Sequence, residues 1–212
     1  METFSLNNVV KIGGTIASNL EFSHEIYDER FYKFFVDVER LSDLKDSLPV
    51  IVSERIIDIN NIKIGDSVLV EGQFRSYNEL NDVKSKLVLS IFAKEIKLSN
   101  EEDVSKINDI ILEGFICKKP IYRKTPLGRE ISDMLVAVNR SYKKSDYIPC
   151  ILWGRNAKYS ETLEVGTKVK LSGRVQARVY EKKQVDGESI KHIAYEISVA
   201  KFGLNEDKQE IL

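Results

Sequence analysis

Apolar and polar residues alternate along much of this chain, with the period of two that is typical of β-strands burying one face. The longest example is residues 168–180, in which apolar residues and glycine alternate with lysine, arginine, serine and glutamine. The other runs that the pattern predicts as strands are 9–16, 31–38, 50–56, 110–117, 131–138, 148–153 and 193–199. The alternation therefore predicts a chain built mainly of short strands.

The chain also repeats itself, with an offset of about 100 residues between matching positions. The pairs that lie 100 residues apart are Asn8 and Asn108, Gly14 and Gly114, Val36 and Val136, Val38 and Val138, and Arg40 and Arg140. A tandem duplication explains this self-similarity. It predicts an N-terminal domain over 1–98, a linker over 99–106, a C-terminal domain over 107–204 and a short tail over 205–212.

Each half contains the same parts in the same order, namely three strands, a short helical stretch and a long hairpin of two strands. Five strands with one helix between the third and the fourth, in about 95 residues, are typical of the OB-fold, a five-stranded Greek-key barrel. We therefore predict an all-β protein with two tandem OB-fold barrels. A small sandwich stays open on the pattern alone.

The single tryptophan, Trp153, ends one of these predicted strands, in the run SDYIPCILWGRNAKYS. The core positions of that strand would be Ile148, Cys150 and Leu152. The strand period then places on the opposite, wetter face Tyr147, Pro149, Ile151 and Trp153. Two large rings on a wet face suit a binding role, whereas a ring that fills the barrel mouth or a subunit interface is the alternative.

Charge is divided unevenly between the two halves. Residues 1–106 carry 13 Lys and Arg against 19 Asp and Glu, a net charge of −6, and residues 107–204 carry 18 against 11, a net charge of +7. The polar face of the run 168–180 forms a basic stripe of Lys168, Lys170, Ser172, Arg174, Gln176, Arg178 and Tyr180. The stripe alone could be an ordinary solvated strand face. The charge of the second half as a whole favours a polyanionic partner.

Aromatic residues of the second half lie close in sequence to cations. The candidates for base stacking are Tyr142, Tyr147, Trp153 and Tyr180. The candidates for phosphate contact are Arg123, Lys124, Arg140, Lys143, Lys144, Arg155, Lys170, Arg174 and Arg178. Unstacked bases need flat apolar surfaces and their phosphates need cations, so this combination on an open β surface favours single-stranded nucleic acid.

Residues 107–203 resemble the bacterial single-stranded DNA-binding protein family, in the runs NDIILEG, PIYRKTPLGREI, VAVNRSY, YIPCILWGRNA and VGTKVKLSGRVQARVY. In that family the positions that match the four rings stack on bases. Those that match Arg123, Arg155, Arg174 and Arg178 lie in or near the path of the DNA backbone. The resemblance implies a protein that coats and protects single-stranded DNA in replication, recombination or repair. It also implies a cytoplasmic, nucleoid-associated homodimer with four OB domains, and replication or repair proteins as further partners.

The first half resembles that family only in its scaffold. At the four ring positions it has Ser42, Ser47, Ser53 and Glu79. Its own aromatic residues cluster around its first hairpin, namely Phe22, Tyr27, Phe31, Tyr32, Phe34 and Phe35. We therefore expect this half to serve structure or assembly rather than stacking. The final residues, KFGLNEDKQEIL, are a weak match to the acidic, hydrophobic tip that recruits partners in the family.

We do not expect an enzyme. His24 and His192 lie far apart, and neither has the spacing of a metal ligand or a neighbouring nucleophile. No metal and no cofactor are expected, and Cys117 and Cys150 should be reduced. No apolar run approaches the ~18 residues of a membrane span, which favours an intracellular location. The competing function is an OB-fold protein-interaction or primosome-type adaptor module, whose sign would be loss of the rings in both halves.

Overall fold

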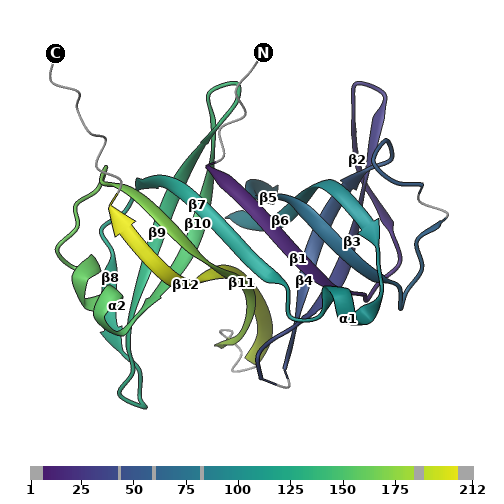
Figure 1. Ribbon diagram of the computed structural model, residues 1–212. Helices are drawn as coiled ribbons and strands as arrows, with labels where there is room; N and C mark the ends of the chain where they lie inside the picture. The colour runs from purple at the N-terminus through teal and green to yellow at the C-terminus, as the bar shows by residue number, and fades with distance from the viewer. Residues whose placement is uncertain (1–6, 43, 59–60, 82–83, 184–188, 205–212) are drawn as a thin grey trace, which may run out of the picture. The chain divides into compact units, whose positions relative to one another are not determined.

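Strands dominate the computed structural model of this protein (Figure 1). The structure describes residues 7–42, 44–58, 61–81, 84–183 and 189–204. The predicted all-β character is therefore confirmed, and the predicted C-terminal tail lies outside the described residues.

The chain divides into two compact units. Unit 1 consists of Met1–Asn8, Ile110–Arg174 and Ile197–Leu212, and unit 2 consists of Val9–Asp109 and Val175–Glu196. The end of the long hairpin of the second half therefore belongs to unit 2, whereas its base belongs to unit 1. The domain boundaries drawn from the sequence remain a prediction, and the two units are described separately.

Six strands form the first half. They are β1 (Asn8–Ile16), β2 (Glu21–Ile26), β3 (Glu29–Glu39), β4 (Lys45–Ser53), β5 (Ser67–Asn81) and β6 (Lys84–Leu98). Neighbouring strands follow the order β2, β3, β4, β6, β5, β1, and a further pairing of β3 with β1 closes the barrel. The strands β4 and β6 run parallel, whereas the hairpin of β5 and β6 is antiparallel.

The second half has the same topology. Its elements are β7 (Asn108–Ile116), β8 (Ile121–Lys124), β9 (Glu130–Arg140), β10 (Lys144–Trp153), α2 (Gly154–Ser160), β11 (Lys168–Lys183) and β12 (Ser189–Leu204), after the short helix α1 (Glu101–Val104). Its strands follow the order β7, β11, β12, β10, β9, β8, with β7 and β9 also paired and with β10 and β12 parallel. Each strand thus has its counterpart in the other half, which agrees with two tandem OB-folds.

Two features of the fold differ from the sequence prediction. Each half has one more strand than predicted, β2 or β8, paired with the edge of β3 or β9. These edge strands are exposed along most of their length and so show no apolar alternation. The helix predicted for both halves is present in the second as α2, whereas in the first the described residues 54–58 and 61–66 contain turns and no α-helix. Isoleucine and asparagine, which have low helix propensity, are frequent in that stretch.

Large apolar side chains fill the interior of each half. Phe34 and Phe74 are fully buried in the first half, and Ile148 and Leu152 are fully buried in the second. Burial of such a side chain contributes about 1.5–3 kcal/mol relative to exposure. These strands are therefore fixed by their inner faces, which leaves the outer faces available for polar and aromatic residues.

Gly14 and Gly114, which the repeat places at equivalent positions, lie where each barrel closes. A Cβ atom would stand 2.2 Å from the carbonyl oxygen of Asp37 at Gly14, and 2.4 Å from that of Ala137 at Gly114. Only glycine lets the first strand of each half approach its partner this closely. The closure of the barrel thus explains why both halves have glycine here.

Candidate nucleic-acid interface

The strand β10 of unit 1 carries two of the predicted stacking residues on its outer face. Ile148, Cys150 and Leu152 are fully buried, whereas Tyr147 is 42% exposed and Trp153 is 39% exposed. The two faces that the sequence predicted are therefore present. Ile151 differs, because it is buried although it was predicted on the wetter face. Its strand has β9 on one side and β12 on the other, and Ile151 lies between Asp133 and Ser198 of these neighbours.

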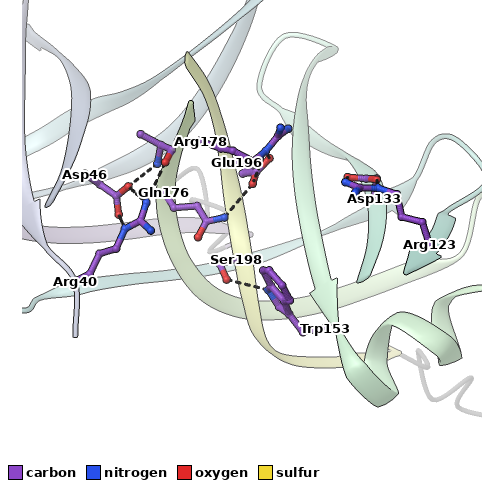
Figure 2. A network of polar contacts seen from close by, with 10 residues as sticks. Arg40, Asp46, Arg123, Asp133, Trp153, Gln176, Arg178, Glu196 and Ser198 are labelled. Atoms are coloured by element: carbon purple, nitrogen blue, oxygen red, sulfur yellow. Dashed lines mark hydrogen bonds and ion pairs between the residues drawn. The ribbon is translucent and has the colours of Figure 1, made fainter. Parts of the chain in front are cut away.

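The indole of Trp153 is held in place by a hydrogen bond. Its Nε1 donates to Oγ of Ser198 on β12 at 3.1 Å, as Figure 2 shows. The parallel pairing of Ile151 with Ser198 brings that hydroxyl to the tryptophan. Sequence reasoning missed Ser198, because this register is not visible in the sequence. A half-exposed ring with its polar atom satisfied can offer an apolar face to a ligand.

Arg123 lies in the same cross-strand row as Trp153. Arg123 on β8 is opposite Ile131 on β9, and Ile131 is opposite Trp153 on β10. Directly opposite residues point to the same face of a sheet. The guanidinium of Arg123 binds Asp133 through two contacts, Nε to Oδ2 at 2.7 Å and Nη2 to Oδ1 at 3.2 Å (Figure 2). Unit 1 thus places a ring and a cation on one surface.

The turn between β9 and β10 presents further predicted residues to solvent. Tyr142 and Lys143 have positive φ values of 62° and 55°, which are uncommon for residues other than glycine. The ring of Tyr142 is 90% exposed, and Lys143 and Lys144 are exposed beside it. Arg140, at the end of β9, is instead paired with the buried carboxylate of Asp146, with Nη1 and Oδ1 3.5 Å apart.

The remaining cations predicted in unit 1 surround these strands. Lys124 at the end of β8, Arg155 in α2 and Lys170 on β11 are exposed, whereas Arg174 on β11 is half-buried. Arg155 follows Trp153 by two residues, because α2 begins directly after β10. The predicted phosphate contacts of unit 1 therefore lie on several elements rather than on one strand.

Unit 2 contains the other two predicted residues, Arg178 and Tyr180, on the outer part of β11. The ring of Tyr180 is 40% exposed and stacks on His192, with centroids 5.5 Å apart and an interplanar angle of 25°. The guanidinium carbon of Arg178 lies 5.6 Å from the centroid of the Tyr180 ring. Ring and cation are thus neighbours, in the manner of a cation–π pair.

A buried acid on β12, Glu196, binds two residues of the predicted basic stripe. Its Oε1 accepts from Nε2 of Gln176 at 2.9 Å, and its Oε2 accepts from Nε of Arg178 at 3.1 Å (Figure 2). Gln176 is 8% exposed, so its predicted place on a solvated face is wrong, because this amide is needed to satisfy Glu196. Part of the positive charge predicted for the stripe is therefore neutralised within the protein.

Arg40 and Asp46 hold the backbone of β11 in unit 2. Asp46 is 1% exposed and accepts from the backbone N–H of Ala177 at 2.8 Å and from Nη2 of Arg40 at 2.6 Å. Nη2 of Arg40 also donates to the carbonyl oxygen of Ala177 at 3.0 Å. The hydrogen bonds to Asp46 raise the pKa of Arg40. These hydrogen bonds, which Figure 2 shows, fix the backbone of β11 next to Arg178. The sequence pattern did not predict them.

In the part of the chain that the structure describes, no group of three or more histidine, cysteine, aspartate or glutamate residues is placed to hold a metal ion. Among the same residues, no helix has the length and apolar character needed to cross a membrane.

Comparison with known sequences finds one family model and several similar proteins. Residues 107–204 match the model of the single-strand binding protein family. Single-stranded DNA-binding protein B of Bacillus subtilis (strain 168) is 34% identical over 84 residues, which are 36% of this chain and 74% of the relative. Single-stranded DNA-binding protein A of that strain is 33% identical over 85 residues, which are 37% of this chain and 49% of the relative. The chain thus spans about half the length of this second relative.

Comparison with solved structures extends the likeness to both halves. The wild-type single-stranded DNA binding protein from Thermus aquaticus has a TM-score of 0.74 and 16% sequence identity, covering 93% of this chain and 92% of that chain. A deletion mutant of the same protein has a TM-score of 0.69 and 17% identity. At this level of identity the likeness concerns the fold, and it agrees with the tandem arrangement.

Proposed function

This chain belongs to the single-strand binding protein family, and on that premise we propose that its second half binds single-stranded DNA. The proposed surface is the outer face of β8, β9 and β10, together with the turn between β9 and β10 and the start of α2. The main observation behind the proposal is the exposure of Trp153. This residue is 39% exposed although its Nε1 donates a hydrogen bond to Ser198. A ring that served only the core would be covered.

Stacking on fixed rings supplies the sequence-independent part of the proposed binding. Base stacking on an aromatic side chain contributes about 1–3 kcal/mol per base. Tyr147 and Trp153 lie six residues apart on one strand, which corresponds to roughly 20 Å. The two rings therefore serve different bases of the same strand. Duplex DNA hides its base faces, so this surface favours single strands.

The cations divide into two groups by their surroundings. Lys143, Lys144 and Arg155 are exposed and suit contacts with phosphates. Arg140 is paired with a carboxylate that is 2% exposed, so we assign it a positioning role at the start of the turn. Arg123 lies in the same cross-strand row as Trp153, and this position suits it to contact the phosphate of a base that stacks there.

The biological role that follows is coating and protection of single-stranded DNA in replication, recombination or repair. Such a role needs no catalysis, and we propose a binding protein rather than an enzyme. A cytoplasmic homodimer with four OB domains is the proposed assembly. Native mass spectrometry tests it directly, because a dimer has twice the 24.3 kDa of the chain.

Substitution of Trp153 tests the proposal. We predict that Trp153→Ala weakens binding of a labelled oligothymidine by about 1–3 kcal/mol, whereas Trp153→Phe, which keeps a ring, loses less. Fluorescence anisotropy at fixed salt measures both, with a duplex of equal length as a weakly bound control. Circular dichroism melting shows whether the fold is intact. Parental affinity in a folded Trp153→Ala variant would contradict the stacking role.

A further inference from the structure

The outer face of the first half has an aromatic ring, Phe92, on β6. Ile151 pairs with Ser198 across the parallel strands of the second half, and Ile51 pairs with Phe92 across the parallel strands of the first. Phe92 therefore stands where the second half has Ser198, the residue that holds Trp153. One ring thus occupies this part of the outer face in each half, although it is attached to a different strand.

Phe92 belongs to a stack of rings that ends in a cation. The guanidinium carbon of Arg75 lies 3.9 Å from the centroid of Phe92. Phe92 lies 5.6 Å from Phe31, which stacks on His24 with a centroid distance of 4.8 Å. Phe31 is buried, whereas Arg75 and Phe92 are partly exposed. Solvent therefore reaches the stack at the guanidinium and the ring that supports it.

The guanidinium of Arg75 is oriented by a neutral group. Oε1 of Gln73 accepts from its Nη2 at 2.8 Å and from its Nε at 3.2 Å. Ser90 lies opposite Arg75 on β6, and the corresponding position of β12 is Glu196, the buried acid that binds Arg178. The first half thus has a hydroxyl, that of Ser90, where the second half has the carboxylate of Glu196.

Two lysines add positive charge to the same region. Burial and the neighbouring charge of Arg75 lower the pKa of Lys94, in that order of size. Nζ of Lys33 lies 5.2 Å from the centroid of Phe35 on the adjacent part of the outer face. Cations that are crowded together beside aromatic rings are stabilised by an anion, and a phosphate is one.

We propose that this face, formed by Lys33, Arg75, Phe92 and Lys94, is a second contact surface for single-stranded DNA. A base stacks on the guanidinium of Arg75, which Phe92 supports, and phosphates lie at Lys33 and Lys94. The ligand class rests on the function proposed for the second half. Because the first half has a net charge of −6, this surface binds weakly and extends a strand that the second half already holds.

A tryptophan probe placed on this face tests the proposal in the full chain. Trp153 is the single tryptophan, so the double variant Trp153→Phe, Phe92→Trp reports on the first half alone. We expect an oligothymidine of about 35 nucleotides, longer than the ~4–16 that one OB-fold covers, to quench its emission. The control is Trp153→Phe, Tyr27→Trp, which places the probe on a side chain that is 95% exposed in the turn between β2 and β3. Its emission should not change.

The same titration separates failure of this inference from failure of the proposed function. If the oligothymidine quenches Trp153 of the parental protein but leaves the probe at position 92 unchanged, the first-half surface is excluded and the second-half function stands. If it quenches neither, both proposals fail. Equal quenching of the probes at positions 92 and 27 also overturns the inference, because it would show that the oligothymidine contacts the first half without preferring the proposed face.

A second pair of variants keeps the native ring in place. We expect Arg75→Gln to weaken binding of the oligothymidine of about 35 nucleotides several-fold. A shorter oligothymidine, of about 8 nucleotides, should quench Trp153 in this variant as it does in the parental protein. Arg55→Gln removes the same charge from an exposed arginine paired with Glu29, and it should leave both unchanged. An equal loss in the two variants would mean that only net charge matters, and it would overturn the stacking role of Arg75. An unchanged affinity in Arg75→Gln would overturn it as well.

Discussion

Trp153 and Ser53 occupy equivalent positions at the ends of two matching strands, and this comparison isolates the role of the ring. Ser53 is 3% exposed and donates a hydrogen bond to Glu29, so the strand forms without an aromatic residue there. The scaffold of an OB-fold therefore does not require the indole. The alternation of apolar and polar residues could predict that Trp153 faces outward. Its hydrogen bond to Ser198 could not be predicted, because Ser198 lies 45 residues away and its position depends on the pairing of β10 with β12.

Arg178 shows where residue-level reasoning from sequence reaches its limit. The alternation of β11 predicts it as an exposed cation, and its side chain is 48% exposed. Its charge is nevertheless offset by Glu196, which is 3% exposed and 18 residues away along the hairpin. A count of charges cannot detect such a pair, because the register of β11 against β12 decides which side chains meet.

Neutralising that acid should therefore strengthen binding. We predict that Glu196→Gln tightens binding of oligothymidine and steepens the dependence of log Kobs on log salt by about 0.7, the value of one additional phosphate contact on a single strand. The free energy of unfolding should fall by about 1–3 kcal/mol, because a buried charged hydrogen bond is lost. Anisotropy titrations over a series of salt concentrations measure the slope.

A matched control for this variant is Glu164→Gln, which makes the same change in net charge at a side chain that is 77% exposed and paired with Lys119. Its slope should change less than that of Glu196→Gln. Equal slopes in the two variants would show that Arg178 is not released for a phosphate.

At the level of elements, the repeat was the most informative part of the sequence. The strands with one buried face could be predicted from alternation, and the shared topology of the two halves agrees with the duplication. The edge strands β2 and β8 could not be predicted, because they bury little and so carry no pattern. The described residues between β4 and β5 contain no α-helix, and this difference from the second half reflects local propensity, which can differ between halves that share a topology.

The glycine at the closure of the second barrel gives a test of this architecture. We predict that Gly114→Ala lowers the free energy of unfolding by about 1–3 kcal/mol, because the new Cβ would meet the carbonyl oxygen of Ala137 at 2.4 Å. Gly203→Ala is the control, since a Cβ there meets nothing within 4 Å, and it should change the free energy by less than about 0.5 kcal/mol. Urea denaturation measures both. Equal stabilities would contradict the close approach of β7 and β9.

At the level of the whole molecule, a net charge of −1 conceals two halves of opposite sign. The positive half is the one that matches the family model and carries the partly exposed rings of Tyr147 and Trp153 on β10. The negative half has the same barrel topology, but the ring and the arginine of its proposed surface lie on other strands. Phe92 lies on β6 and Arg75 lies on β5. On this basis we propose that the second half holds the main binding surface and that the first half adds a weaker one.

The emission of Trp153 on addition of oligothymidine tests the central claim most directly, because the chain has no other tryptophan. We predict strong quenching at low salt and recovery as salt is raised, with log Kobs falling linearly against log salt. An emission that stays unchanged at stoichiometric oligonucleotide and low salt would contradict stacking on Trp153, and with it the proposed binding surface.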